Sequence, residues 1–225
     1  LHEENGKQTG GPSMEDVSKA VIEAVDHHAQ IINISLSDIT DLPQMRRAVD
    51  YAESHGSLII SSAGNRLTSA STKDGRRFPA AYSQVVGVTA VDTDLNITDD
   101  SVHGTQVDIA APGAYVASTV PGGVDCLYAT DAASTSFATA YVSGAAALIA
   151  SQYPNETPAQ WRQRLLVSAN RPNSDQRDNN IGWGLVDPQT ALNIALSDSL
   201  RGPTSTGGMH AQNNAETSCS QIDHA

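Results

Sequence analysis

Two helical patterns of apolar residues occur in the first third of the chain. After Ser13, apolar residues recur at helical spacing at positions 17, 20, 21, 24 and 25. This pattern predicts a helix with Ser13 as its N-cap and Asp16 three residues further on. A second pattern is predicted to open at Asp41 and to end at Gly56. The apolar side of this second helix consists of Leu42, Met45, Val49 and Ala52.

Continuous apolar runs alternate with these helices. They cover residues 31–37, 57–62 and 85–91, and their β-branched composition predicts strands that are buried on both faces. Strand, helix and strand in this order predict a parallel sheet with right-handed crossovers. Two shorter strands are predicted at 107–113 and 114–119. The predicted fold class is therefore α/β, with a mainly parallel sheet between helices.

A long run of small residues at 134–150 predicts a further helix that neighbouring elements can approach closely. Ser134 or Thr135 can cap this helix. Ser136 then lies in the first turn, where unpaired N–H groups and the helix dipole favour negative charge. A serine whose attack creates an oxyanion suits that position. Taken alone, however, the pattern is explained more simply by a capped, buried helix.

The remaining segments complete the predicted outline of the fold. Residues 121–133 are predicted to form a loop. Thr157 and Pro158 open a helix that buries Trp161, Leu165 and Leu166, and a last helix extends from residue 188 to about 196. From 197 to 225 the composition shifts to Ser, Gly, Thr, Asn and Gln, which predicts a disordered linker or tail. Residues 1–196 are predicted to form one partial domain.

Composition and charge exclude several classes of function. The 225 residues include 13 Lys and Arg against 25 Asp and Glu, so the formal net charge is −12 and a nucleic-acid partner is excluded. No phosphate-binding loop and no glycine-rich dinucleotide motif follows a strand, which excludes a nucleotide-binding domain. Cys126 and Cys219 do not have metal-site spacing, and their pairing stays open. No metal and no cofactor is predicted.

Asn65 ends the strand at 57–62 on a glycine-containing turn. By itself an asparagine there is an ordinary turn residue. Because the carboxyl ends of parallel strands share one edge of a sheet, Asn65 is expected near the turn after 31–37. Together, Asn65 and Ser136 suit acyl transfer. The serine oxygen would attack a carbonyl carbon, and the Ser136 N–H with the Asn65 amide would hold the resulting oxyanion.

Five segments resemble, in order, the motifs of subtilisin-like serine proteases. They are 32–37, 61–65, 107–113, 134–144 and 182–188. The resemblance implies a three-layer subtilisin-like fold and cleavage of a peptide or protein substrate without a cofactor. It implies that Ser136 is the nucleophile and Asn65 the oxyanion donor. It also implies a substrate cleft lined, through backbone pairing, by Ser35, Leu36, Ser37, Ala63 and Gly64.

Within this family, the segments 135–138, 141–144 and 153–160 are most similar to mycosins, the envelope-anchored proteases of actinobacterial type VII secretion systems. This resemblance implies a secreted or cell-envelope protein that is membrane-anchored when intact, with 197–225 as the linker to its membrane helix. It also implies an alternative function as a non-catalytic structural component of the type VII secretion membrane complex.

Three departures from the family pattern affect catalysis. Ser134 replaces the glycine before Thr-Ser, and Ala140 replaces the usual proline. The third departure is that neither the aspartate motif nor the histidine motif of the triad precedes residue 31. His103 stands in a His-Gly-Thr sequence, but it follows Asn65 and is rejected as the base. We therefore expect a fragment that lacks its N-terminal part and its general base and is nearly inert. Its substrate and any calcium binding stay open.

Overall fold

The computed structural model describes residues 12–66, 73–120, 124–171, 175–197, 200, 202 and 203, together with two short paired strands. These two strands are β1 (Glu3–Glu4) and β2 (Lys7–Gln8), which pair antiparallel. The tail predicted at 197–225 lies almost wholly outside the described residues, as does Cys219.

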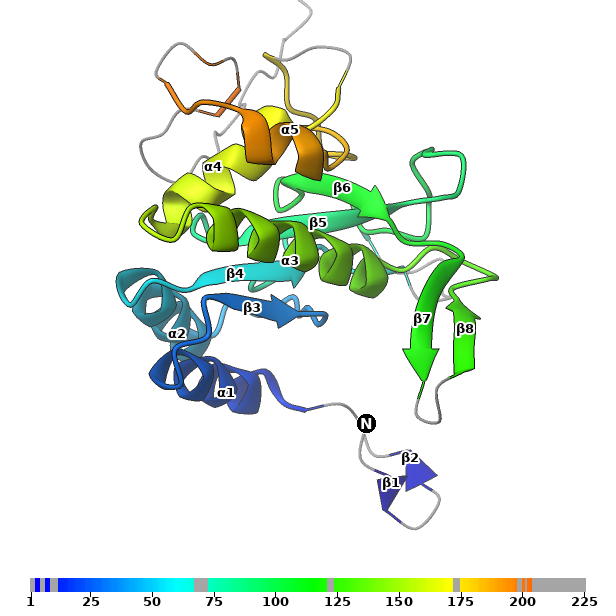
Figure 1. Ribbon diagram of the computed structural model, residues 1–225. Helices are drawn as coiled ribbons and strands as arrows, with labels where there is room; N and C mark the ends of the chain where they lie inside the picture. The colour runs from blue at the N-terminus through cyan, green and yellow to red at the C-terminus, as the bar shows by residue number, and fades with distance from the viewer. Residues whose placement is uncertain are drawn as a thin grey trace, which may run out of the picture.

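Four parallel strands form the centre of the fold, in the order β3–β4–β5–β6 (Figure 1). They are β3 (Ile31–Ile34), β4 (Leu58–Ser62), β5 (Val86–Val91) and β6 (Ile109–Pro112). Since neighbouring strands pair in parallel, all four carboxyl ends lie at one edge of the sheet. We call this edge the carboxyl edge.

Helices cover both faces of this sheet (Figure 1). One face carries α1 (Met14–Asp26) and α2 (Pro43–Ser54), and the other carries α3 (Thr135–Gln152), α4 (Pro158–Ser168) and α5 (Pro188–Asn193). Alternate residues of β4 belong to different cores: Ile59 packs with α1 and α2, whereas Leu58 and Ile60 pack with α3 and α4. Burial on both sides explains the continuous apolar runs of the strands. The predicted three-layer α/β fold is confirmed.

The edge strand β3 differs from the prediction of burial on both faces. Ile32 and Ile34 are buried in the core formed with α1 and α2. Asn33 is exposed, and its side-chain oxygen accepts a hydrogen bond from Ser143 of α3 at 2.9 Å. Since β3 lies at the edge of the described sheet, its side toward α3 is only partly covered.

The first two helices begin differently from one another. Ser13 caps α1 as predicted, because its hydroxyl accepts a hydrogen bond from the Asp16 N–H at 3.2 Å. On the same helix Ala20 is exposed, contrary to the prediction, and Ser18 is buried with its hydroxyl donating to the Glu15 carbonyl. Asp41 was wrongly predicted to open α2. That helix begins at Pro43, and the Asp41 carboxylate instead accepts from the Tyr82 hydroxyl at 2.8 Å.

The later helices match their predicted starts. Thr157 caps α4 in a reciprocal capping box with Gln160, and Trp161, Leu165 and Leu166 are buried as predicted. Asp187 caps α5 by accepting from the Thr190 N–H, and this helix ends at Asn193, earlier than predicted.

The segment after β6 departs furthest from the prediction. β7 (Val116–Val120) pairs antiparallel with β8 (Val124–Tyr128), which lies within the predicted loop. This hairpin projects from the body beside the start of α3 (Figure 1), and the Tyr128 ring contacts Phe137 with centroids 5.5 Å apart. Leu127 is 60% exposed. β7 matches the strand predicted at 114–119, whereas β8 was not predicted, because the hairpin buries neither face fully and its second strand lacks a clear alternation.

Candidate active site

The start of α3 lies at the carboxyl edge of the sheet, where loops from three strands hold it. The Ser134 N–H donates to the Gly113 carbonyl after β6 at 2.9 Å. Thr135 bonds to Asn65 after β4, and Ser136 bonds to Ser35 after β3. A Cβ atom on Gly113 would lie 2.7 Å from the Ser134 carbonyl oxygen, so a glycine is needed for this close approach. Three consecutive residues are thereby positioned from three sides.

Ser136 is half-buried in the first turn of α3 and paired with Ser35. The Ser136 hydroxyl donates to the Ser35 carbonyl oxygen at 3.3 Å, and the Ser35 hydroxyl donates to the Ser136 carbonyl oxygen at 3.0 Å. A peptide carbonyl is far too weak a base to remove the hydroxyl proton at neutral pH. This arrangement orients the Ser136 oxygen without activating it.

Thr135 fixes the orientation of the Asn65 carboxamide. The Asn65 Oδ1 atom accepts from the Thr135 N–H and from the Thr135 hydroxyl, both at 2.9 Å. Thr135 is fully buried, and its hydroxyl oxygen also lies 2.6 Å from the Ser62 hydroxyl oxygen. Gly64, with φ +107°, turns the chain so that Asn65 reaches this position. Thr135 was predicted only as a possible cap of the helix, and its place directly before Ser136 in the sequence was the available signal for a role in the site.

Two N–H donors from separate elements converge on one oxygen atom. The Asn65 Nδ2 atom lies 3.5 Å from the Ser134 hydroxyl oxygen, and the Ser136 N–H donates to the same oxygen at 3.3 Å. The Ser136 N–H is one of the donors at the helix N-terminus that have no carbonyl partner within the helix, and the helix dipole there favours negative charge. A pair of fixed donors aimed at one point beside a serine hydroxyl is the arrangement required to stabilise an oxyanion.

The residues predicted to line a substrate cleft border this point. Leu36 is 39% exposed, and Ser35 and Ser37 are half-buried. Ala63 and Gly64 already use their N–H groups within the protein, since Ala63 donates to the Val88 carbonyl and Gly64 to the Ser62 hydroxyl. Their N–H groups are therefore not available to pair with a substrate backbone.

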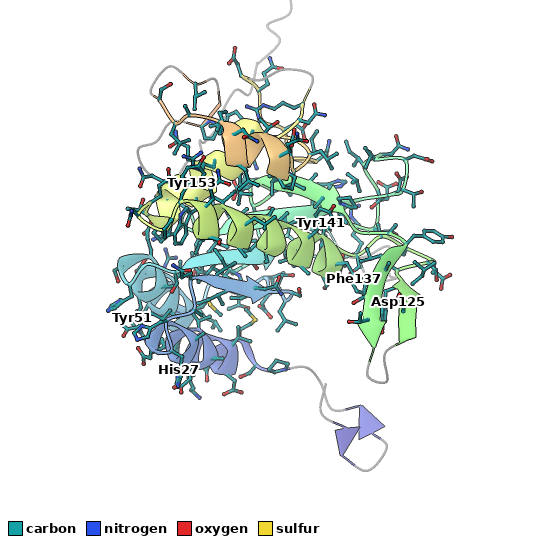
Figure 2. The ribbon with its side chains drawn as sticks, in the orientation of Figure 1. His27, Tyr51, Asp125, Phe137, Tyr141 and Tyr153 are labelled. Atoms are coloured by element: carbon teal, nitrogen blue, oxygen red, sulfur yellow. The ribbon has the colours of Figure 1, made fainter. Side chains whose placement is uncertain are left out.

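Three of the described histidines lie at the opposite edge of the sheet from Ser136. His27 and His28 directly follow α1 and precede β3, and His55 follows α2 and precedes β4. Figure 2 shows His27 at the lower left and Phe137, the neighbour of Ser136, on the right, at the start of α3.

His103 also makes no hydrogen bond to Ser136. Its backbone N–H donates to the Asp74 carboxylate at 2.8 Å, and its Nε2 atom is buried without a hydrogen-bond partner in the described structure. Among the described residues, neither a histidine nor a carboxylate hydrogen-bonds to the Ser136 hydroxyl.

The described ranges contain no cluster for a metal ion, no membrane-spanning helix and no disulfide of Cys126. No group of three or more His, Cys, Asp or Glu side chains there could hold a metal ion. None of the helices in that part of the chain is long and apolar enough to cross a membrane. Cys126 is half-buried in β8 and has no disulfide partner among the described residues.

Comparison with known protein sequences identifies the family. Residues 4–184 match the model of the subtilase family, peptidase family S8. Subtilisin from Bacillus pumilus is 36% identical over 168 residues, which cover 75% of this chain and 58% of that protein. A thermostable alkaline protease from Halalkalibacterium halodurans is 34% identical over 162 residues, covering 72% of this chain and 42% of that protein. The chain thus spans about half the length of these relatives.

Solved structures show the same similarity. The protease MycP1 from Mycobacterium smegmatis superposes with a TM-score of 0.74 at 26% identity, covering 84% of this chain and 57% of that chain. A chain in the periplasmic assembly of the ESX-5 inner membrane complex superposes with a TM-score of 0.71 at 28% identity, covering 84% of this chain and 53% of that chain. The family match, the three-layer fold and the serine at the start of α3 agree, and this chain belongs to the subtilase family.

Proposed function

We propose that this chain carries the nucleophile and the oxyanion-binding groups of a subtilisin-type serine endopeptidase. The observation that carries the proposal is the convergence of the Asn65 Nδ2 atom and the Ser136 N–H on one oxygen position beside the Ser136 hydroxyl. The family membership supports the same reaction.

In the proposed reaction, the Ser136 oxygen attacks the carbonyl carbon of a peptide bond. The carbonyl oxygen becomes an oxyanion, which the Ser136 N–H and the Asn65 amide stabilise. The bond to the nitrogen then breaks, the amine leaves with a proton, and the acyl group stays on Ser136 as an ester. Water hydrolyses that ester and regenerates the hydroxyl. We place an extended peptide substrate along Ser35, Leu36 and Ser37.

The proton of Ser136 needs an acceptor, and the described histidines do not provide one. His27, His28 and His55 lie at the far edge of the sheet, and the Ser136 hydroxyl bonds to the Ser35 carbonyl and not to His103. We therefore assign the general base to residues outside the described ones. Without such a base, catalysis by the oxyanion-binding groups and substrate binding alone retains about 10³–10⁴-fold over water in subtilisin, a member of this family.

The experiment is labelling with a fluorophosphonate, followed by mass spectrometry of the digested protein. We expect slow labelling of the peptide that contains Ser136. Ser136→Ala should abolish this label, whereas Ser143→Ala, on the same helix, should keep it. Labelling that persists in Ser136→Ala, or that spreads equally over other serines, would rule out Ser136 as the nucleophile.

A second proposal is that the protein acts in the cell envelope as a structural component of a type VII secretion complex. Its support is the similarity to a chain within the ESX-5 inner membrane complex. In a host with such a system, Ser136→Ala should then leave assembly of the complex intact while peptide cleavage is lost. Failure of the wild-type protein to co-purify with the membrane complex would overturn this proposal.

A further inference from the structure

One of the three departures from the family pattern places a hydroxyl group inside the proposed oxyanion site. Ser134 stands where the nucleophile motif of the family has a glycine, which has no side chain to place there. We propose that the Ser134 hydroxyl occupies the oxyanion position and blocks it until the side chain rotates away. This inference rests on the proposed function, because it concerns the same two donors.

The geometry identifies the position that is filled. The Ser134 Oγ atom accepts from the Ser136 N–H at 3.3 Å and from the Asn65 Nδ2 at 3.5 Å. These are the two donors that a substrate oxyanion requires. Two oxygen atoms cannot occupy one point, so a substrate carbonyl oxygen reaches both donors only after the Ser134 oxygen has left.

Ordinary helix capping explains only half of this arrangement. A capping serine accepts from an N–H group in the first turn of its own helix, as Ser134 does from Ser136. Asn65 belongs to the loop after β4, and 69 residues separate it from Ser134. Its carboxamide nitrogen is directed at Ser134 because Thr135 holds the carboxamide oxygen on the other side. The second donor is therefore a property of the site.

The block can be removed by rotation of one side chain. The backbone of Ser134 is held in place, since its N–H donates to the Gly113 carbonyl at 2.9 Å. Rotation about the Cα–Cβ bond takes a serine hydroxyl to another staggered position without moving the backbone. Both bonds that hold the hydroxyl are longer than typical N–H···O distances, so each is weak. We therefore expect the block to slow acylation by about tenfold rather than abolish it.

The first test is structural and does not depend on activity. High-resolution crystal structures of the wild-type chain and of Ser134→Gly are compared. Glycine is nearly as good an N-cap as serine, so α3 should keep its start. We expect the wild-type hydroxyl oxygen between Asn65 Nδ2 and the Ser136 N–H, and a water molecule at that point in the variant. A wild-type hydroxyl directed away from the two donors would overturn the inference.

The second test is a double-mutant cycle on the rate of fluorophosphonate labelling. We expect Ser134→Gly to label about tenfold faster than wild type, and a much smaller gain when Asn65→Leu is already present. A general effect of the cap would give equal gains in both backgrounds, which would contradict the inference. Ser13→Gly, which removes the matching cap of α1, should leave the rate unchanged.

The two tests separate this inference from the proposed function. If the crystal structures show the hydroxyl between the two donors but no variant labels at Ser136, the proposed function fails and the occupancy stands. If Ser136 labels at the same rate in wild type and in Ser134→Gly, the proposed function stands and the block is refuted.

Discussion

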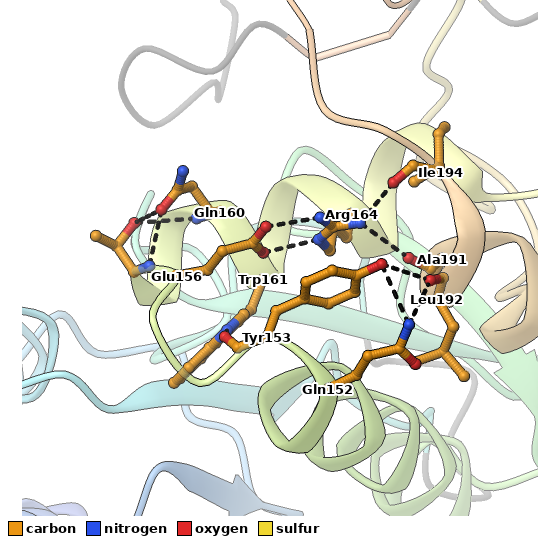
Figure 3. A network of polar contacts seen from close by, with 10 residues as sticks. Gln152, Tyr153, Glu156, Gln160, Trp161, Arg164, Ala191, Leu192 and Ile194 are labelled. Atoms are coloured by element: carbon orange, nitrogen blue, oxygen red, sulfur yellow. Dashed lines mark hydrogen bonds and ion pairs between the residues drawn. The ribbon is translucent and has the colours of Figure 1, made fainter.

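Two polar networks lie on the α3 side of the molecule, one at each end of that helix. At its N-terminus, the network of Ser35, Asn65, Ser134, Thr135 and Ser136 consists of neutral groups. Near its C-terminus, a second network joins α3 to α4 and α5 around the guanidinium of Arg164 (Figure 3). The two networks differ in charge and in the lengths of their hydrogen bonds.

The Arg164 network is charged, buried and closely bonded. Arg164 is only 4% exposed and binds both carboxylate oxygens of Glu156, at 2.6 and 2.7 Å. The guanidinium also donates to the Ile194 carbonyl at 2.6 Å and lies 3.5 Å from the centre of the Tyr153 ring. The Glu156 carboxylate raises the pKa of Arg164 above its ordinary value. Short hydrogen bonds between charged groups are strong, so we expect Arg164 to keep these partners.

The network at the start of α3 has the opposite character. Its two N–H donors to Ser134 act over 3.3 and 3.5 Å and share one hydroxyl that a single rotation can remove. A network of this kind can exchange its acceptor for a substrate oxygen. Short hydrogen bonds between buried charges hold α3, α4 and α5 together around Arg164. The longer hydrogen bonds to the Ser134 hydroxyl, which can rotate, suit a position where a ligand atom binds.

The largest expected effect is on stability, at Arg164. Arg164→Met leaves Glu156 without its cation, and breaking a buried ion pair costs about 3–5 kcal/mol. We expect the free energy of unfolding in urea to fall by about that amount, with the labelling rate of the folded protein at Ser136 unchanged. Arg47→Met, at an exposed position on α2, should change stability by less than about 0.5 kcal/mol. Equal losses in the two variants would show that the buried ion pair of Arg164 makes no special contribution to stability.

The next effect is on chemistry, at Asn65. Asn65→Leu removes one oxyanion donor, and loss of the corresponding donor in subtilisin costs about 10²–10³-fold in rate. We expect a comparable fall in the rate of labelling at Ser136. Asn65→Asp should also react slowly, because a carboxylate repels the developing oxyanion.

The same pair of variants separates chemistry from stability. Asn65→Asp keeps an acceptor for the N–H and hydroxyl of Thr135, so its unfolding free energy should exceed that of Asn65→Leu. Labelling at the wild-type rate in either variant would show that donation from Nδ2 does not contribute to the reaction.

The smallest effect concerns acid stability, at the cap of α5. The hydrogen bond from the backbone N–H of Thr190 lowers the pKa of the Asp187 carboxyl below its ordinary value. A lowered folded-state pKa contributes stability above the unfolded-state pKa, and this contribution is lost as the pH falls through the folded-state value. The melting temperature should therefore decline below about pH 4 more steeply in wild type than in Asp187→Asn, whose amide caps without titrating.

A matched variant completes this test. Asp187→Ala removes the cap at every pH and should cost about 1 kcal/mol at neutral pH. Since Ile194, which directly follows α5, supplies its carbonyl to Arg164, this loss should add to instability at the Arg164 network and leave labelling at Ser136 unchanged. A changed labelling rate in Asp187→Ala would show that the two networks are coupled.

Much of the fold follows from local patterns in the sequence. The apolar runs at 57–62 and 85–91 predicted the central strands, because two-sided burial requires such runs. The caps Ser13 and Thr157 were found since a capping contact spans only three residues. The strand β7 was predicted, but β8 and its pairing with β7 were missed because the exposed faces of the hairpin impose no alternation.

The sequence by itself determined the layers, the family motifs and the residue types at the start of α3, since all of these are encoded over short stretches of chain. Tertiary structure alone decided that Thr135 orients Asn65 and that the Ser134 hydroxyl lies between the two donors. These contacts join residues about seventy positions apart, and their geometry depends on how β4 and α3 pack together. A pattern along one strand or one helix carries no information about that distance.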